Sequence, residues 1–242
     1  AGGFPGDYLE PVYRCARCRD TGYEGEPVKR MCTCLRQAYF RRLYESAGPE
    51  ASFEAFDLSV FDGTERLPGV DLTQRQLMTL LRNECEKYAD RYPRAEVREL
   101  VFTGKSGLGK TYLMHCVARR LLERGISAVM VTSYRYLEAA RQAVFAGDSE
   151  ALDRCMGAEV LLLDDLGSEP MLNNVTVEQI FTLVNERERT GRGLVVSTNL
   201  NEAELRARYT ERVTSRLLSA DSCRVLNFLG RDLRRPKGGG GL

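Results

Sequence analysis

The stretch Gly104–Thr111 carries the residues with the most definite chemistry. Its sequence, GKSGLGKT, fits the phosphate-binding pattern G-x-x-x-x-G-K-[ST] and lies between an apolar run and a helical pattern. Glycines allow a tight turn in which backbone N–H groups converge on phosphate oxygens at the N-terminus of the following helix. We predict that Lys110 reaches the β- and γ-phosphates of a nucleotide and that Thr111 ligates Mg²⁺. The other residues of the predicted nucleotide site around this loop are Gly104, Lys105, Ser106, Gly107, Leu108, Gly109 and Tyr112.

Two acidic residues follow a second apolar run, Val160–Leu163. The continuous apolar pattern is typical of a strand buried on both faces of a parallel sheet. Carboxylates at the end of such a strand lie at the sheet edge, beside the phosphate loop. We predict that Asp164 holds Mg²⁺ and that Asp165 orients or deprotonates the attacking water. Asp165 is one methylene shorter than the glutamate of many related enzymes, so a chain that binds nucleotide without hydrolysing it stays an alternative.

Three polar residues further along the chain are candidates for the hydrolytic reaction. Asn199 follows the apolar run Leu194–Ser197 and could position the water, although it could instead cap the next helix. Arg212 and Arg216 are four residues apart and therefore share one helix face. An arginine supplied to a neighbouring subunit can raise a hydrolysis rate by about 10³–10⁵-fold. We predict this role for Arg216 first and Arg212 second, with surface salt bridges as the alternative.

Four of the eight cysteines cluster near the start of the chain, as Cys15-x-x-Cys18 and Cys32-x-Cys34. Thiolates on two short turns suit a tetrahedral Zn²⁺, and four cysteines leave no open coordination position, so we predict a structural zinc site. This zone has few aliphatic residues, so the metal would contribute much of its folding free energy, about 10 kcal/mol. Reduced free cysteines or a redox pair are the alternative. The other four cysteines lie in apolar or helical segments, as expected in a reducing compartment.

From residue 71 onward, apolar strand patterns alternate with helical patterns. This alternation predicts a parallel sheet with right-handed crossovers. The predicted strands are Leu100–Thr103, Ile126–Val131, Val160–Leu163, Leu194–Ser197 and Arg224–Phe228. The predicted helices are Thr73–Tyr92, Lys110–Glu123, Tyr134–Ala146, Glu150–Met156, Val175–Thr190, Glu202–Tyr209 and Glu211–Leu218.

Composition divides the chain into three parts. We assign residues 1–50 to a basic, zinc-binding region, 51–70 to a linker with aromatic anchors, and 71–242 to an ATPase core with a flexible glycine tail. No apolar run approaches the about 18–20 residues of a membrane span, and no signal peptide is visible, so we expect a cytoplasmic protein. A net charge of +1 gives no overall nucleic-acid signal. Basic stretches near both ends, and the sequence Tyr134-Arg135-Tyr136, leave DNA contact open beside solvated surface and core packing.

The order of several motifs resembles bacterial helicase loaders of the DnaC/DnaI type, above all the clostridial and phage versions that carry an N-terminal zinc knuckle. These motifs are CARCRDTGY, CTC, SFEAFDLSVF, FTGKSGLGKTYL, VLLLDDLGSE, VVSTNL and ERVTSRLL. The resemblance runs from about Tyr13 to Arg234. It implies an α/β P-loop NTPase fold of the AAA+ class, with a parallel sheet sandwiched by helices, no full lid domain, and a small zinc-binding domain in front.

The same resemblance implies partners and further roles. It implies a cytoplasmic ATPase that binds ATP, Mg²⁺ and single-stranded DNA, engages the hexameric replicative helicase of the DnaB type through its N-terminal region, and assembles with itself through the ATPase interface. Arg234, in the closing sequence FLGRDLR, would be the sensor-2 residue that contacts the γ-phosphate. Two alternatives stay open. One is an IstB-type transposition helper ATPase that acts on duplex DNA, although the zinc knuckle disfavours it. The other is a non-hydrolysing, nucleotide-dependent adaptor.

Overall fold

The computed structural model describes residues 11–27, 29–32, 34–35, 38, 51–172 and 175–234. The chain divides into two compact units, Ala1–Leu43 and Tyr44–Leu242. The predicted glycine tail, and residues 1–10 and 39–50 of the predicted zinc-binding region, lie outside the described residues.

The first unit contains a short antiparallel ribbon. Its strands are β1 (Tyr23–Glu24) and β2 (Arg30–Met31). The turn before the ribbon is closed by Asp20, whose carboxylate accepts hydrogen bonds from the backbone N–H groups of Arg14 (3.0 Å) and Cys15 (2.8 Å). These bonds, that from Arg14 first, lower the pKa of Asp20. Asp20 also has a φ of 62°, a left-handed conformation that Asp tolerates better than most residues.

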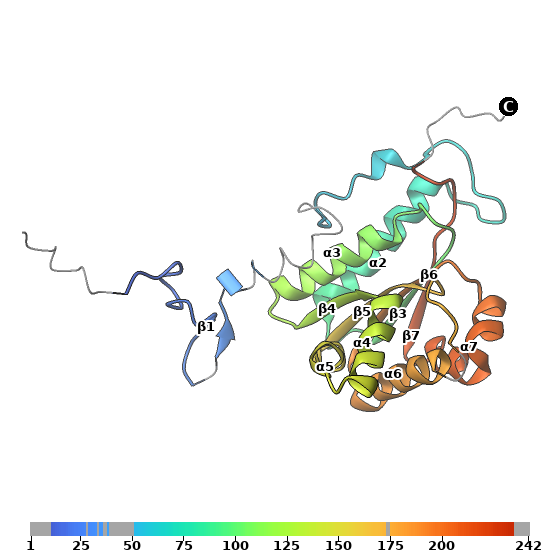
Figure 1. The fold of residues 1–242 in the computed structure, drawn as a ribbon. Helices are drawn as coiled ribbons and strands as arrows, with labels where there is room; N and C mark the ends of the chain where they lie inside the picture. Colours follow the sequence, from blue (N-terminus) through green and yellow to red (C-terminus); the bar gives the residue numbers. More distant parts are fainter. Residues whose placement is uncertain are drawn as a thin grey trace, which may run out of the picture. The chain divides into compact units, whose positions relative to one another are not determined.

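A five-stranded parallel sheet forms the centre of the second unit (Figure 1), in the order β4-β5-β6-β3-β7. The strands are β3 (Glu99–Thr103), β4 (Ala128–Thr132), β5 (Val160–Leu166), β6 (Gly193–Thr198) and β7 (Cys223–Asn227). Every residue of β6, and all but one of β5, is buried, as continuous apolar runs predict. The predicted α/β parallel sheet is confirmed.

Helices cover both faces of this sheet (Figure 1). One layer consists of α2 (Gln74–Arg91) and α3 (Lys110–Glu123), which pack on each other. The opposite layer consists of α4 (Ser133–Phe145), α5 (Glu150–Gly157), α6 (Thr176–Thr190) and α7 (Glu202–Leu217). Apolar side chains of α6 and α7 close the core against the sheet, among them Ile180, Leu183, Leu205, Val213 and Leu217. No helix among the described residues is long and apolar enough to cross a bilayer.

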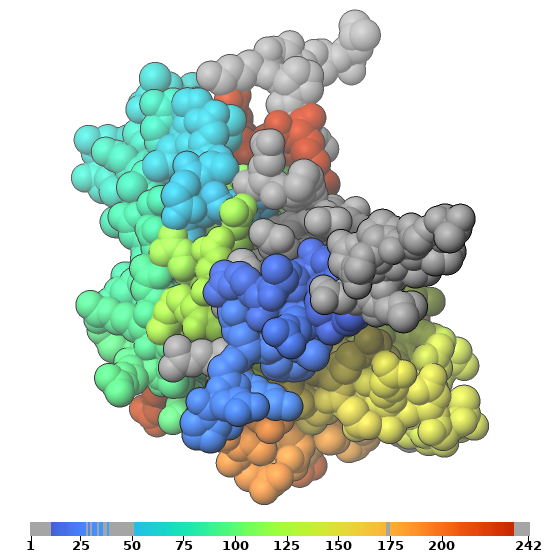
Figure 2. All heavy atoms as spheres, turned by 90° about the vertical axis from the view of Figure 1, so that its left-hand side faces the viewer, coloured from blue at the N-terminus to red at the C-terminus, as the bar shows by residue number. Residues whose placement is uncertain are grey.

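The segment that we interpreted as a linker packs against α2 and α3. The side chains of Phe53 and Phe61 are only 2% exposed. The carbonyl oxygen of Phe53 accepts two hydrogen bonds from Arg82 on α2, at 3.1 and 2.9 Å. The ring of Phe56 stacks on Phe61 and tilts against Tyr112 of α3, with centroids 5.7 and 5.5 Å apart. In the space-filling view the cyan segment that begins at residue 51 lies against the green surface of α2 and α3 (Figure 2).

Most predicted helices and strands begin and end within two residues of the observed ones, and two elements differ more. Strand β5 continues to Leu166, so it contains both acidic residues instead of ending before them. The two helices predicted from Glu202 to Leu218 form one helix, α7, which is interrupted at Thr210 by non-helical backbone (φ 72°, ψ 161°).

Candidate nucleotide-binding site

Glycines shape the loop that joins β3 to α3. Gly104, Gly107 and Gly109 have φ values of 133°, 78° and 95°, a region that residues with a Cβ rarely occupy. A Cβ on Gly104 would lie 2.2 Å from the carbonyl oxygen of Phe228. Because Gly109 has no side chain to cap α3, the N–H groups of the first helical turn can receive an anion. The loop therefore fits a phosphate group.

Lys110 lies at the centre of this loop and is 7% exposed. Its ammonium donates hydrogen bonds to the carbonyl oxygens of Gly104 and Lys105 (2.8 Å for Lys105) and to Oδ1 of Asn199 (2.8 Å). Burial lowers the pKa of Lys110, and the nearby carboxylate of Asp165 opposes that shift. Lys110 thus joins the phosphate loop to the end of β6.

A β-bulge places both predicted acids at the site. The pairing of β5 with β6 shifts between Leu163 and Leu166. Asp164 and Asp165 therefore face a single residue of β6, Ser197. The Ser197 hydroxyl donates to Oδ1 of Asp164 and accepts a hydrogen bond from the backbone N–H of Asp165 at 2.9 Å. One serine thus fixes two consecutive carboxylates.

The two predicted magnesium ligands lie side by side. The hydroxyl of Thr111 donates to both carboxylate oxygens of Asp164, at 3.2 and 3.1 Å. Asp164 is 8% exposed, so its charge lies in a partly desolvated position. Hydroxyl and carboxylate oxygens next to a phosphate loop are ligands that suit Mg²⁺. The donor set therefore fits the ion.

Asn199 connects the second acid to the lysine. Its Nδ2 donates to Oδ1 of Asp165 at 3.0 Å, while its own Oδ1 accepts from Lys110. Asp165 has a φ of 58°, so its backbone is left-handed at the bulge. The cap of α7 is Asn201, which accepts a hydrogen bond from the N–H of Glu204, so capping is not the role of Asn199.

The segment after β7 returns to the phosphate loop. Nη2 of Arg234 donates to the hydroxyl of Ser106 at 2.8 Å. The carboxylate of Asp232 accepts from both the backbone N–H and Nε of Arg234, at 3.0 and 3.2 Å. The N–H of Leu233 donates to the carbonyl oxygen of Gly107 at 3.0 Å. The residue expected as a γ-phosphate sensor thus touches the loop itself.

A cavity of about 520 Å³ opens beside the loop. Its size falls within the range of about 300–1,000 Å³ that is usual for small-molecule sites. Its walls mix apolar and polar side chains: Asp62, Glu65, Arg66, Leu67, Pro68, Gln74, Leu108, Phe228, Leu229 and Arg231. Of these residues, the sequence patterns predicted only Leu108. The one available signal was the set of aromatic anchors before residue 62, which marks a segment that packs.

Arg212 and Arg216 lie elsewhere, on the opposite layer from α3 (Figure 1). Their guanidinium carbons lie 3.7 and 5.1 Å from the ring centroid of Phe181 on α6. Arg216 also donates to the carbonyl oxygen of Arg212 (3.1 Å) and approaches Glu188 at 3.7 Å. Arg212 is exposed and Arg216 is half-buried, and both guanidinium groups pack on Phe181 of α6.

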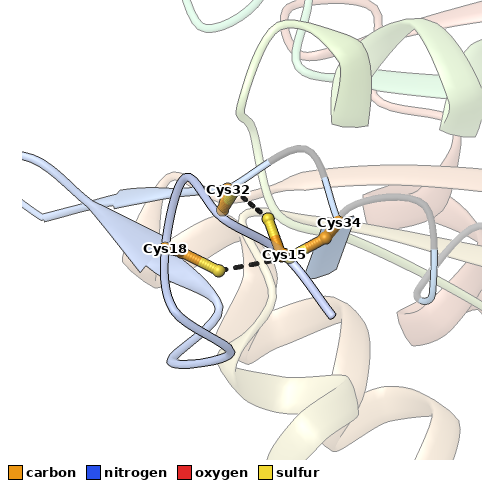
Figure 3. A group of neighbouring side chains, drawn as sticks. All are labelled: Cys15, Cys18, Cys32 and Cys34. Carbon is orange, nitrogen blue, oxygen red and sulfur yellow. Dashed lines mark hydrogen bonds between the residues drawn. The ribbon is translucent and has the colours of Figure 1, made fainter. Parts of the chain in front are cut away.

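The predicted zinc ligands converge in the first unit. Figure 3 shows the four thiols pointing toward one another, and all four sulfur atoms lie within 4.8 Å of each other. The Sγ atoms are 3.8 Å apart for Cys15 and Cys32 and 3.3 Å apart for Cys18 and Cys34. A tetrahedral zinc with Zn–S bonds of about 2.3 Å requires S···S distances of about 3.8 Å. Hydrogen bonding to the backbone of Cys18 lowers the pKa of Cys15 to about 7, whereas hydrogen bonding to the thiol of Cys18 raises the pKa of Cys34 to about 12. The four thiols fit a zinc ion.

Of the predicted DNA-stacking residues, Tyr136 is a core residue, only 1% exposed, whereas Tyr134 is 56% exposed. The two tyrosines of that sequence therefore have different environments, and only Tyr134 is available to a ligand.

A glycine loop between strand and helix, with acids on a nearby parallel strand, defines a P-loop nucleotide-binding protein with an AAA+ fold. The chain belongs to the IstB-like ATP binding protein family, whose model matches residues 72–230.

Two curated relatives are replicative helicase loaders. DnaC of Escherichia coli (strain K12) is 26% identical over 149 residues, which are 60% of this chain and 59% of DnaC. DnaI of Bacillus subtilis (strain 168) is 29% identical over 112 residues, which are 46% of this chain and 36% of DnaI. The chain thus spans less than two thirds of the length of either relative. The crystal structure of the DnaC helicase loader has the same fold, with a TM-score of 0.59 and 20% identity over 73% of this chain and 98% of that chain. The resemblance drawn from the motifs is confirmed.

Proposed function

We propose that this chain is an ATP-dependent loader of a hexameric replicative DNA helicase, which binds ATP with Mg²⁺ and single-stranded DNA. One observation carries the proposal: Lys110, Thr111, Asp164 and Asn199 converge beside a nucleotide-sized cavity, in a chain similar to two replicative helicase loaders. The similarity supplies the partner and the geometry supplies the chemistry.

In this proposal the cavity holds the adenosine and the loop holds the phosphates. The ammonium of Lys110 exchanges its contacts with Gly104 and Lys105 for the β- and γ-phosphate oxygens. Gln74 holds the far wall, because its side chain donates to the carbonyl oxygen of Arg231 at 3.1 Å. Arg234 lies at the loop through Ser106 and reaches the γ-phosphate from there.

Hydrolysis needs a positioned water and a proton acceptor. Asp165 and Asn199 form a hydrogen-bonded pair that can hold a water in line with the γ-phosphate. The carboxylate of Asp165 accepts the proton of this water, while Thr111 and Asp164 hold Mg²⁺, which neutralises phosphate charge. Arg216, with Arg212 as second candidate, is supplied to the site of a neighbouring subunit. The site is therefore complete only between two copies of the chain.

We assign residues 1–50 to a zinc-binding region that contacts the helicase, 51–70 to a connecting segment, and 71–242 to the ATPase core. The four cysteines hold zinc in a structural role, because a Cys₄ set leaves no position for substrate. The connecting segment also lines the cavity, through Asp62 and residues 65–68.

Capture of a replicative DnaB-type hexamer on the immobilised chain, with and without ATP and Mg²⁺, tests the proposal. The wild-type chain should retain the helicase in an ATP-dependent manner, and Lys110→Ala should lose both ATP binding and the ATP dependence. Lys87→Ala is the matched control, because Lys87 lies on α2 in an ion pair with Glu96 at 3.1 Å. Normal ATP affinity in Lys110→Ala would refute the assignment of the nucleotide site. Equal capture of the helicase with and without ATP would refute the claim that ATP controls helicase binding.

The family description favours one second candidate, an IstB-type transposition helper ATPase. Such a protein would assemble on duplex DNA, whereas a loader should prefer single strands. Binding to labelled duplex and single-stranded oligonucleotides of equal length, with ATP present, separates the two. A third possibility, an adaptor that does not hydrolyse ATP, follows from the short side chain of Asp165. Steady-state turnover in the presence of helicase and single-stranded DNA decides that question.

A further inference from the structure

Glu169 is a fully buried carboxylate outside the groups assigned to the reaction. It lies in the loop that follows β5, four residues after Asp165, and its side chain is 0% exposed. A buried carboxylate is costly unless hydrogen bonds satisfy it. Oε2 accepts from the backbone N–H of Gly167 at 2.9 Å. The carboxylate thus closes the turn that follows Asp164 and Asp165 in the sequence.

The other oxygen of Glu169 reaches α7. The hydroxyl of Tyr209 donates to Oε1, and Arg208 lies 3.6 Å from the same atom. Arg208 also donates to the carbonyl oxygen of Glu169. Burial, followed by the hydrogen bond to Glu169, raises the pKa of Tyr209, so its hydroxyl keeps its proton. One buried carboxylate therefore joins the loop after β5 to the first half of α7.

Strained backbone follows this contact. Thr210 has φ 72° and ψ 161°, a conformation that costs a β-branched residue about 1–3 kcal/mol. The hydroxyl of Thr214 donates to the carbonyl oxygen of Thr210 at 3.0 Å and holds the kink. Arg212 and Arg216 lie in the part of α7 that follows this kink. Because the kink sets the direction of the second half of α7, the anchor at Tyr209 sets where the two guanidinium groups lie.

The same loop is tied to the carboxylates. The hydroxyl and the backbone N–H of Ser168 both donate to the carbonyl oxygen of Asp165, at 2.8 and 3.1 Å. A Cβ on Gly167 would lie 2.7 Å from Leu200, the residue after Asn199, so this loop packs closely on the end of β6. Asp165, Glu169 and Tyr209 are therefore links in one short chain of contacts.

We propose that Glu169 is a positioning residue for the arginine pair: through Tyr209 it fixes α7, just before its kink, against the loop that follows Asp164 and Asp165. This rests on the proposed function, in which Arg216 completes the site of a neighbouring copy. Within one subunit, the carboxylate then links the acids of that subunit's own site to the arginine that the subunit supplies to the neighbouring site, so that a subunit which holds its own acids in place also presents its arginine.

A mixing experiment with the full-length chain tests the proposal. Lys110→Ala lacks a nucleotide site but keeps its arginines, and Arg216→Ala lacks the arginine but keeps its site. A mixture of the two should hydrolyse ATP, although each alone is inactive. Tyr209→Phe, which removes only the hydroxyl, is then added to one partner at a time. In the Lys110→Ala partner it should lower turnover about tenfold, a part of the about 10³–10⁵-fold that a supplied arginine contributes. In the Arg216→Ala partner it should change turnover less than twofold.

Two controls separate positioning from folding. Tyr136→Phe removes another buried tyrosine hydroxyl, whose contact is the sulfur of Met156 at 4.0 Å, and should be neutral in either partner. Glu169→Gln is a second variant, to be used if Tyr209→Phe folds poorly. It keeps the shape of the side chain but replaces one of the two accepting carboxylate oxygens by an amide N–H₂ group, and it should lower turnover only in the Lys110→Ala partner. Equal losses in both partners, or no loss in either, would overturn the role of Glu169. If the mixture without the tyrosine change is inactive, the supply of Arg216 between subunits is itself refuted, and this inference with it.

Discussion

Gly107→Ala provides a sharp test of how the C-terminal segment supports the phosphate loop. A Cβ at Gly107 would lie 1.7 Å from Oδ1 of Asp232. That oxygen accepts hydrogen bonds from the backbone and side chain of Arg234. Because the obstructing atom ends a short side chain, the collision can be relieved if Asp232 rotates away, which releases Arg234 from the loop.

Gly125→Ala is the matched control for the free-energy cost of placing an alanine at a positive φ. Gly125 has φ 83°, close to the 78° of Gly107, and nothing lies within 4 Å of its Cβ position. The left-handed conformation costs a residue with a Cβ about 1–2 kcal/mol at either position. Each kcal/mol lowers the melting temperature of a domain of this size by about 2–4 °C. Both variants should therefore melt a few degrees below wild type.

Only Gly107→Ala should also weaken nucleotide binding. Displacement of Asp232 removes the support of Arg234 and distorts the loop amides, and we expect ATP affinity to fall at least about tenfold, or 1.4 kcal/mol. Titration of a fluorescent ATP analogue, beside thermal unfolding of each variant, measures both effects. Equal ATP affinity in Gly107→Ala and Gly125→Ala would show that the contact between Asp232 and the loop is irrelevant to the site.

Two further predictions concern stability. Burial raises the pKa of Glu99 from 4.5 to about 7, and its Oε2 has no hydrogen-bond partner among the described residues. The folded chain therefore holds a proton that the unfolded chain loses, so this group destabilises the fold as pH rises from about 4.5 to 7, by about 3 kcal/mol in all. Glu99→Gln should gain that much over wild type in denaturant unfolding between these pH values, and a constant difference would contradict it. Removal of zinc by a chelator should make residues 11–35 sensitive to protease while ATP affinity stays within twofold; continued protection would argue against the metal.

Local pattern was enough to predict the loop and the sheet. The glycine spacing, the lysine and the continuous apolar runs are properties of short stretches, and each one dictates its own backbone conformation. Helix α3 begins and ends where the pattern places it, at Lys110 and Glu123. The acids were predicted as a pair because both follow the same apolar run.

The arrangement of those acids could not be read in the same way. The bulge opposite Ser197 depends on the register between two strands that lie about 30 residues apart in sequence. A shift of pairing by one residue has no sequence signature when the paired runs before it, Leu161–Leu163 and Leu194–Val196, are entirely apolar and buried on both faces. The cavity wall was missed for a related reason: residues 62–68 have no periodicity. Their place depends on backbone hydrogen bonds such as those from Arg75 N–H to the carbonyl oxygen of Asp62 and from Leu67 N–H to that of Leu72, both 2.8 Å.

Glu169 was missed because a single glutamate between serine and proline in a loop is ordinary surface composition. Its partner Tyr209 lies 40 residues away in sequence, so no local pattern connects them. The break predicted between Tyr209 and Glu211 did mark the kink, although it was interpreted as a boundary between helices. Burial of an acid in a loop is a tertiary property, and only the fold reveals it.

If Arg216 acts between subunits, the rate of ATP hydrolysis depends on whether copies of the chain have assembled. The arginine pair packs against Phe181, and Arg216 approaches Glu188. Asp164 and Asp165 lie near the end of β5, where they contact Thr111 and Asn199. An isolated chain would then bind ATP through Lys110 and Asp164 but lack the cation that stabilises the transition state. Because Asp165 is a short base, the dependence on a supplied arginine should be stronger here than in a chain with glutamate at that position. If the chain is the loader proposed above, slow turnover in the isolated chain and faster turnover in an assembly would let ATP persist until the assembly has formed on its partner.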